Sequence, residues 1–219
     1  MLKKYLPKII ITSLIVLLPI VFGLIVWNKL PEQVPTHFGP SGDADGWSSK
    51  AFAVFMLPLF MLVMHIFCAI TTLIDPKRRN VDGKPFGMAL WLCPAISLAS
   101  NGAMYSMALG YKFNTSVVVM LLFGVLLIIL GNYLPKCGQN YTIGIKTPWA
   151  LDDPKNWTAT HRIGGKVYMT AGLILIPLSF LCAMSEYAFW IVFVVMMVTV
   201  SIPALYSYLY YCKHGKTEE

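Results

Sequence analysis

The chain has 219 residues, of which 57% are hydrophobic and 12% are charged, and its formal net charge is +7. Its mean hydropathy is +0.66, and it carries far fewer charges than the about 25% of an ordinary soluble domain. Because these charges gather in clusters between long apolar runs, they cannot cover the surface of a water-soluble domain of this size. The composition therefore excludes a soluble domain and indicates an integral membrane protein.

Six apolar runs follow one another along the chain, each long enough to cross a hydrocarbon core of about 30 Å as an α-helix. The first run follows Lys3 and Lys4, as a signal peptide would, but it is too long for a typical h-region and ends without a small-x-small cleavage site. We therefore expect an all-α membrane fold, a six-helix transmembrane bundle in a single polytopic domain over 1–219, with spans at about 9–27, 51–74, 88–109, 117–134, 167–184 and 187–211.

The basic residues are distributed unevenly between the two sides of this predicted bundle. Of the 17 Lys and Arg residues, 14 lie on the side that holds both chain ends, and only Lys29, Lys50 and Lys112 lie on the other. The positive-inside rule therefore predicts a multi-pass protein of a bacterial cell membrane with both termini in the cytoplasm (N-in/C-in). The net positive charge is explained by this topogenic bias, so we expect contact with membrane lipid and no direct nucleic-acid binding.

The outer loop, 29–50, is the first long connection, and its prolines and glycines predict a series of consecutive turns. A histidine with two carboxylates, His37 with Asp43 and Asp45, could bind a divalent metal. As an EF-hand the segment fails, because the twelfth position from Asp43 is Val54 instead of glutamate. The favoured alternative is that the aspartates are turn residues and His37 is a hydrogen-bonded loop residue, so no metal or cofactor is expected. The five cysteines show no C-x-x-C spacing, which indicates neither a disulfide framework nor a zinc site.

The inner loop, 135–166, is the second long connection. Asp153 before Pro154 is typical of a helix N-cap, and it predicts a short helix from Pro154 to about Ile163. Three side chains would converge on that helix, since they lie within four residues of one another: Trp157, Thr160 and His161. The alternative is a helix lying at the membrane interface, with its tryptophan at headgroup depth and its basic residues against anionic lipid.

The spans themselves contain little ionisable chemistry. No Asp, Glu, Lys or Arg lies in the middle of a span, which disfavours a proton-coupled or ion-coupled pump. His65 is the one titratable exception, and we expect it to be packed and hydrogen-bonded. Asn101, among small residues, indicates close helix packing. Five spans contain a proline, which predicts kinks: Pro19, Pro58, Pro94, Pro177 and Pro203.

A weak internal repeat relates the two halves of the chain. The first span ends in Asn-Lys-Leu-Pro at 28–31 and the fourth in Asn-Tyr-Leu-Pro at 132–135, and each opens into a long loop that carries a tryptophan. Because the halves begin on opposite sides of the membrane, the pattern suggests a 3+3 inverted repeat about an axis in the membrane plane, as in many transporters.

The two loops carry a more specific pattern. The outer stretches are LPEQVPTHFG at 30–39 and GDADGWSSK at 42–50, and the inner ones are GNYLP, NYTIGIKTPW and WTATHRIGG, which begin at 131, 140 and 157. In these segments and their order the sequence resembles the bacterial SdpI family. Lys146 departs from the pattern, because an arginine is expected there, and lysine lacks the fork that binds an anion through two parallel bonds.

The resemblance implies an immunity protein, and no enzyme, that protects its host from a secreted membrane-active antimicrobial peptide. It also implies a signalling role, in which the toxin-engaged protein recruits a soluble transcriptional repressor to the membrane. The residues carried over for toxin or ligand binding in the outer loop are His37, Asp45, Gly46 and Trp47. Those carried over for signalling or partner binding in the inner loop are Asn140, Gly144, Thr147, Pro148, Trp149, Thr160, His161 and Arg162.

Two other classes of function stay open at this point. A small membrane transporter or exporter is suggested by the repeat and by the proline-broken helices, although the missing mid-membrane charges count against it. A membrane-embedded metal-dependent hydrolase would use His37 with Asp43 and Asp45, or His161. Against that alternative, the sequence contains neither H-E-x-x-H nor G-x-S-x-G.

Overall fold

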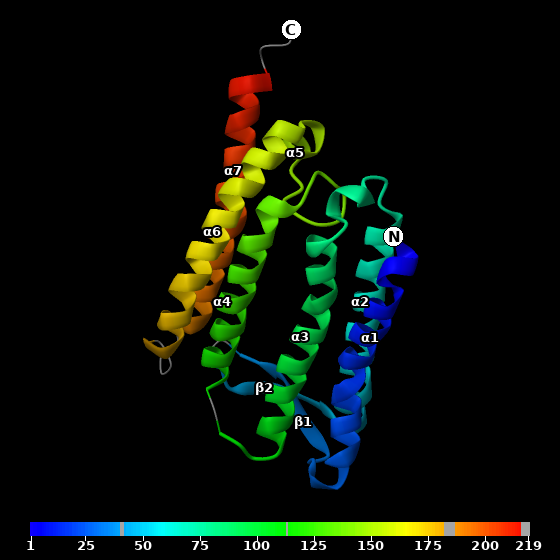
Figure 1. Ribbon diagram of the computed structural model, residues 1–219. Coiled ribbons are helices and arrows are strands. Elements are labelled where there is room, and N and C mark those ends of the chain that lie inside the picture. The colour runs from blue at the N-terminus through cyan, green and yellow to red at the C-terminus, as the bar shows by residue number, and fades with distance from the viewer. Residues whose placement is uncertain (40–41, 113, 182–186, 216–219) are drawn as a thin grey trace.

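The computed structural model describes residues 1–39, 42–112, 114–181 and 187–215, which form a bundle of long helices with a small β-hairpin at one end (Figure 1). Within these residues six helices are long and apolar enough to cross a membrane. They are α1 (Leu2–Ile25), α2 (Leu57–Ile74), α3 (Lys84–Ala108), α4 (Thr115–Tyr133), α6 (Pro154–Leu181) and α7 (Ala188–His214). The predicted six-helix membrane bundle is confirmed, and the predicted end of the fifth span, 182–184, lies outside the described residues.

The bundle has two distinct ends. α1 begins and α7 ends at the same end, which we call the terminal end, and the hairpin lies at the opposite end, which we call the hairpin end (Figure 1). The short helices η3 (Arg78–Val81), η4 (Leu134–Lys136) and α5 (Pro148–Asp152) lie in the connections at the terminal end. The other short helices, η1 (Trp27–Lys29) and the π-helical turn η2 (Phe52–Met56), flank the hairpin.

The six helices form two groups of three. α1, α2 and α3 pack on one another, and α4, α6 and α7 form the second group, in which α4 packs most extensively on α6. Helices of different groups contact each other much less, and the principal contact between the groups is that of α3 with α4 (Figure 1). The groups coincide with the two halves of the proposed inverted repeat, whose symmetry stays a prediction.

The outer loop contains a β-hairpin, so the expectation of consecutive turns throughout it was wrong. β1 (Gln33–Phe38) pairs antiparallel with β2 (Ala44–Ser49), with irregularities in the register on both sides of His37. Pro35 lies within β1, and it is tolerated because each strand of a two-stranded sheet has one unpaired edge where no N–H is required. The prolines and glycines of the loop therefore led to a prediction of turns where two short strands form.

The hairpin is fixed to the bundle by a buried cluster. Val34 of β1 is fully buried and packs in one cluster with Leu30, Val54, Met104 and Tyr105. These residues come from the chain before the hairpin and from the helical segments that follow it, so the hairpin is held by apolar burial in addition to its own hydrogen bonds.

A single helix, α6, replaces two predicted elements. We expected a short helix over 154–163 and a separate span from 167, yet the helix is continuous for 28 residues. Gly165 lies within it because α4 approaches closely: a Cβ at this position would be 2.7 Å from the carbonyl oxygen of Gly131 and 2.7 Å from Pro135. Glycine here serves helix packing and does not break the helix.

Buried polar side chains join α1 to its neighbours. Thr12 Oγ1 lies 2.9 Å from Nε2 of His65 on α2, and both residues are buried, so the expected packed and hydrogen-bonded histidine is confirmed. Ser97 Oγ on α3 donates to the carbonyl oxygen of Val16 at 3.1 Å. Asn101 is also buried, and its Nδ2 donates to the carbonyl oxygen of Ser97 on the same helix at 2.8 Å, so its role in packing between helices stays a prediction.

Candidate functional site

The hairpin presents a histidine and an aspartate in contact with each other. His37 Nδ1 on β1 lies 2.5 Å from Asp45 Oδ1 on β2, and their side chains are 76% and 51% exposed. Gly46 is paired with His37, and a Cβ at Gly46 would lie 2.9 Å from the Cβ of the histidine. The glycine therefore leaves the space in which the His37 ring reaches Asp45.

Trp47 completes the exposed part of the hairpin. Its side chain belongs to β2 and is 56% exposed, whereas Val34 on the partner strand is fully buried. An exposed tryptophan beside this acid–imidazole contact offers apolar area together with polar groups, and tryptophan is enriched in binding sites. The structure thus brings together the four residues carried over for the outer loop.

The geometry of the outer loop bears on both interpretations of His37, Asp43 and Asp45. His37 is hydrogen-bonded, as the second interpretation expected. Asp43 lies in the turn between the two strands, also as expected, but Asp45 lies in β2 and is not a turn residue. Among the residues that the structure describes, no group of three or more His, Cys, Asp and Glu side chains is placed to hold a metal ion. The pair is therefore best described as an exposed acid–imidazole contact.

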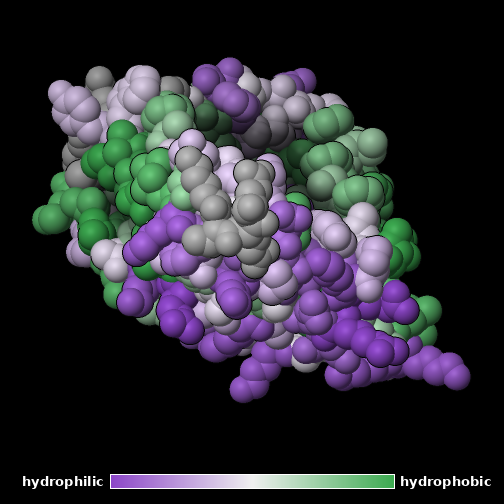
Figure 2. Space-filling view, turned by 90° about the horizontal axis from the view of Figure 1, so that it is seen from above, coloured by the Kyte–Doolittle hydropathy of each residue, from purple (hydrophilic) through white to green (hydrophobic). Residues whose placement is uncertain are grey.

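The terminal end holds the residues carried over for the inner loop. Figure 2 shows hydrophilic side chains gathered on this end and hydrophobic ones on its flanks. We call residues 137–153, between η4 and α6, the connecting segment. It contains one short helix, α5, and otherwise no regular secondary structure, so its shape depends on side-chain hydrogen bonds to the backbone.

Asn140 organises the first part of the connecting segment. It is fully buried, and its Oδ1 accepts from the backbone N–H groups of Thr142 at 2.8 Å and Ile143 at 2.6 Å. Its Nδ2 donates to the carbonyl oxygens of Gly138 at 2.9 Å and Ile143 at 2.8 Å. Both ends of the amide are used within the loop, so Asn140 shapes the segment.

Asp75, at the end of α2, is a residue that sequence reasoning missed. It is only 3% exposed, and its Oδ2 accepts from the backbone N–H of Tyr141 at 2.8 Å and from Thr142 Oγ1 at 3.1 Å. Its Oδ1 accepts from the N–H of Lys77 at 2.7 Å. The Asp-Pro pair at a span end is a signal for a turn, but nothing in the sequence reveals partners 66 residues away.

Lys77 and Asn80 also join the α2–α3 connection to the connecting segment, through Gln139. Lys77 Nζ donates to Gln139 Oε1 at 2.5 Å, and Asn80 Nδ2 donates to the carbonyl oxygen of Gln139 at 2.7 Å. The amide of Gln139 in turn donates to the carbonyl oxygens of Ala150 and Leu151. Gln139 therefore links the α2–α3 connection to α5, and so the first group of helices to the second.

His161 holds the second part of the connecting segment. The backbone N–H of Ile145 donates to its Nε2 at 3.0 Å, and its Nδ1 donates to the carbonyl oxygen of Trp157 at 2.8 Å. One nitrogen accepts and the other donates, so the ring is neutral in this geometry. Gly144 has φ +125 and lies against the ring, where a Cβ would collide with Nε2. Both nitrogens are used within the fold, and neither is offered to a substrate.

Trp157 is a core residue, and its burial disagrees with the alternative in which the ring is anchored among lipid headgroups. It is 1% exposed, its ring stacks on His161 with centroids 4.0 Å apart, and its Nε1 donates to the carbonyl oxygen of Cys137 at 2.8 Å. The convergence of these two rings is confirmed. Burial also raises the pKa of the Cys137 thiol to about 11, so this thiol is protonated at neutral pH.

Thr160 points to a different partner than expected. Its Oγ1 donates to Asn156 Oδ1 at 2.9 Å, and Ser207 Oγ of α7 donates to the same oxygen at 2.9 Å. Because the single Ser207 proton is used there, Thr147 Oγ1, 2.6 Å from Ser207 Oγ, must be the donor in their contact. Asn156 and Ser207 were not predicted as site residues, yet they connect Thr160 to Thr147, which were.

The remaining residues carried over for the inner loop differ in how far they are exposed. Pro148 begins α5, and Trp149 packs on Tyr208 and Tyr211 of α7 with ring centroids 5.0 and 6.4 Å away. Arg162 and Lys146 are exposed. Of the eight residues carried over for the inner loop, the structure buries Asn140, Thr160 and His161 and leaves Pro148 and Arg162 exposed. The residues carried over for the outer loop lie on the hairpin, at the opposite end of the bundle.

A last contact joins α1 to the α2–α3 connection. Asp82 Oδ1 accepts from Lys4 Nζ at 2.8 Å and from the Tyr5 hydroxyl at 2.7 Å. The hydrogen bonds from Lys4 and then from Tyr5 lower the pKa of the Asp82 carboxyl from its ordinary value. The start of the chain is thus tied to the terminal end of the bundle.

Comparison with known proteins gives two family matches and one relative. Residues 136–207, which include the connecting segment, match the SdpI/YfhL protein family. Residues 14–62, which include the hairpin, match a family described as domain of unknown function (DUF1648). The chain is 31% identical over 207 residues to the immunity protein SdpI of Bacillus subtilis (strain 168), which covers 94% of this chain and 97% of that protein. No solved structure matches it. At this identity over almost its whole length, the chain belongs to the SdpI/YfhL protein family.

Proposed function

We propose that this protein is an SdpI-type immunity protein, which gives a bacterium resistance to a secreted membrane-active peptide toxin. The likeness to the immunity protein SdpI over nearly the full length of both chains carries the proposal. The exposed hairpin supports it, because His37, Asp45 and Trp47 offer polar and aromatic contacts on a hairpin that a buried cluster fixes to the bundle. The protein acts by binding and is not an enzyme.

The orientation in the membrane follows from the charge distribution. We place the terminal end in the cytoplasm and the hairpin on the outer face of a bacterial cell membrane, because 14 of the 17 basic residues belong to the terminal side. Reporter fusions after Gly215 and within the turn between β1 and β2 test this arrangement. A reporter active only outside the cytoplasm should respond in the turn and stay silent after Gly215, and the opposite pattern would refute it.

Protection of cells tests the immunity role itself. Expression of the chain in a toxin-sensitive bacterium is expected to raise survival under a secreted membrane-active peptide. The His37→Ala and Trp47→Ala double variant should lose protection at equal membrane abundance, because it removes the acid–imidazole contact and the exposed ring. Gln33→Ala, an exposed change on the same hairpin, is the matched control and should protect like the parent.

The survival assay tests the immunity role and the hairpin contact separately. If the parent chain gives no protection against any such peptide, the immunity role is wrong. If protection is present but survives the double change, the hairpin is not the toxin contact, and the contact must be sought elsewhere on the chain.

A signalling role is the finer part of the proposal. We assign recruitment of a soluble repressor to the terminal end, where the connecting segment is built on the network of Asn140, His161 and Ser207. The exposed Pro148 and Arg162, with the partly exposed Trp149, are the side chains of this set that a soluble partner can reach. Toxin-dependent movement of a repressor to the membrane fraction is the readout, and its loss in Arg162→Ala with protection intact is the expected result.

A further inference from the structure

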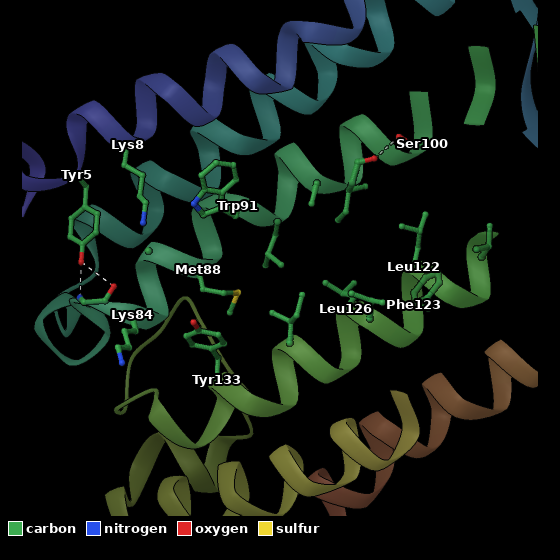
Figure 3. Close-up of a pocket in the computed structure, with 18 of the residues that line it drawn as sticks. Tyr5, Lys8, Lys84, Met88, Trp91, Ser100, Leu122, Phe123, Leu126 and Tyr133 are labelled. Carbon is green, nitrogen blue, oxygen red and sulfur yellow. Dashed lines mark hydrogen bonds between the residues drawn. The ribbon is translucent and has the colours of Figure 1, made fainter. Parts of the chain in front are cut away.

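A cavity of about 880 Å³ separates the two groups of helices. It is lined by side chains of α1, α3 and α4, and it lies where the groups make their limited contact (Figure 3). Several of its lining side chains are exposed at the helix surface, including Trp91, Leu122 and Val125. The cavity is therefore open to the side, toward the hydrocarbon region of the membrane.

Its lining changes in character along its length. Toward the hairpin end it is apolar, with Leu122, Phe123 and Leu126 of α4 facing α3 (Figure 3). Lysines gather at the terminal end, where α1 and α3 begin: Lys4, Lys8 and Lys84. An apolar trough that ends in positive charge at headgroup depth matches the two parts of an anionic phospholipid.

Two of these lysines have their charges free for a ligand. Lys4 is paired with Asp82 at 2.8 Å, but within the described part of the chain neither Lys8 nor Lys84 has a carboxylate within ion-pair distance. Lys8 extends from α1 to α3, since a Cβ at Gly87 would lie 3.1 Å from its Nζ. Gly87 thus leaves room for the ammonium group at the mouth of the cavity.

We propose that this cavity is a binding site for one anionic phospholipid from the leaflet at the terminal end. The phosphate lies between the ammonium groups of Lys8 and Lys84, and an acyl chain lies along α3 and α4 in the apolar part. A bound lipid would fill the space between the two groups of helices. The proposal concerns a different surface from the hairpin and does not depend on the immunity role.

Native mass spectrometry of the purified full-length chain in neutral detergent tests the proposal. The chain is titrated with dioleoylphosphatidylglycerol and, separately, with the zwitterionic dioleoylphosphatidylcholine. We expect one phosphatidylglycerol per chain at concentrations that leave phosphatidylcholine unbound. The Lys8→Gln and Lys84→Gln double variant should bind phosphatidylglycerol roughly 30-fold more weakly, which is the combined effect of two lysines near an anionic lipid.

Two further variants make the test specific. Lys3→Gln with Lys213→Gln removes the same charge from the terminal end but from residues that do not line the cavity, and it should bind phosphatidylglycerol like the parent. Ala95→Trp places an indole in the apolar part and keeps both lysines, and it should also lose the bound lipid. Circular dichroism and gel filtration show whether each variant is folded, and only folded variants are compared.

Several results would overturn the site. Equal binding of the two lipids, or equal weakening in both lysine pairs, would show that general charge attraction is responsible. Retention of phosphatidylglycerol by folded Ala95→Trp would show that the cavity does not hold the acyl chain. If a membrane-active peptide crosslinks to a photoreactive residue at Leu122 while no phosphatidylglycerol binds, the cavity takes a peptide and the lipid proposal is wrong.

Discussion

The backbone N–H of Ile145 donates a hydrogen bond to His161 Nε2 at 3.0 Å, and this bond joins the connecting segment to α6. It requires an unprotonated Nε2, and the bond from Nδ1 to the carbonyl oxygen of Trp157 selects that tautomer. His161 therefore holds the connecting segment in its conformation, and that segment carries most of the residues proposed for partner binding. Gly144 lies against the same ring, where a Cβ would meet His161 Nε2.

Gly144→Ala should destabilise the protein more than the same change at a glycine with open surroundings. The added methyl group would meet φ +125 and collide with His161 Nε2, whereas Gly110, with φ +90, has nothing within 4 Å. We expect a loss of about 1–2 kcal/mol in unfolding free energy for Gly110→Ala from backbone strain, and of about 3 kcal/mol or more for Gly144→Ala from strain plus overpacking. Thermal unfolding in detergent measures both, and equal losses would mean that the ring is not in the way.

Asp75→Asn should loosen the connecting segment without changing the spans. An amide keeps one oxygen for the N–H of Lys77 but replaces the acceptor of Tyr141 N–H and Thr142 Oγ1 with a donor. Loss of charge-assisted bonds at a buried carboxylate costs about 2–3 kcal/mol. Faster proteolysis within 138–147 than in the parent is the readout. Asp152→Asn, an exposed change on α5, is the control and should match the parent; equal proteolysis in Asp75→Asn would contradict the assigned role.

The helices could be predicted from the sequence because membrane spans are read from a one-dimensional property, the length of an apolar run. The six runs became six long helices, and the packed, hydrogen-bonded role expected for His65 is confirmed. The expected boundary between a short helix ending near 163 and a span beginning at 167 was wrong, because α6 continues through Gly165. The glycine allows α4 to approach closely, and residues of α4 are more than thirty positions earlier in the sequence.

The site was less accessible to sequence reasoning. The contact of Trp157 with His161 spans one helical turn and was predicted from spacing. The roles of Asp75 and Ser207 depend on partners 66 and 51 residues away, which only the packing of the helices brings close. The hairpin was missed because Pro35 and the glycines around it indicate turns more strongly than the short strands indicate pairing.

Acid should weaken the contact of α1 with the α2–α3 connection through Asp82. Hydrogen bonds from Lys4 and Tyr5 lower its pKa in the folded protein below the ordinary value of 3.8. The contact therefore contributes its full stabilisation above pH 3.8 and loses it as the pH falls through the lower folded value. Asp82→Asn should reduce the fall in melting temperature between pH 5 and pH 3.

Salt provides the control for this pH effect. Because the Lys4 and Asp82 side chains are 58% and 39% exposed, their pairing is screened by ions and its contribution is small. The difference in acid sensitivity between the parent and Asp82→Asn should shrink when the ionic strength is raised. An acid sensitivity that is identical in the two proteins at low salt would show that another carboxyl group is responsible.

Close packing of α4 on α6 should depend on Gly131. A Cβ there would lie 2.6 Å from the backbone nitrogen of Met169 and 2.7 Å from the carbonyl oxygen of Gly165, so the helix backbones would have to separate. Gly131→Ala should therefore cost about 1–3 kcal/mol of unfolding free energy through overpacking. Gly102→Ala on α3, where a Cβ meets nothing within 4 Å, should instead gain about 0.5–1 kcal/mol from the reduced backbone freedom of the unfolded chain. Opposite signs in detergent unfolding are the expected result, and a stabilising Gly131→Ala would mean that the two helices lie further apart than the structure places them.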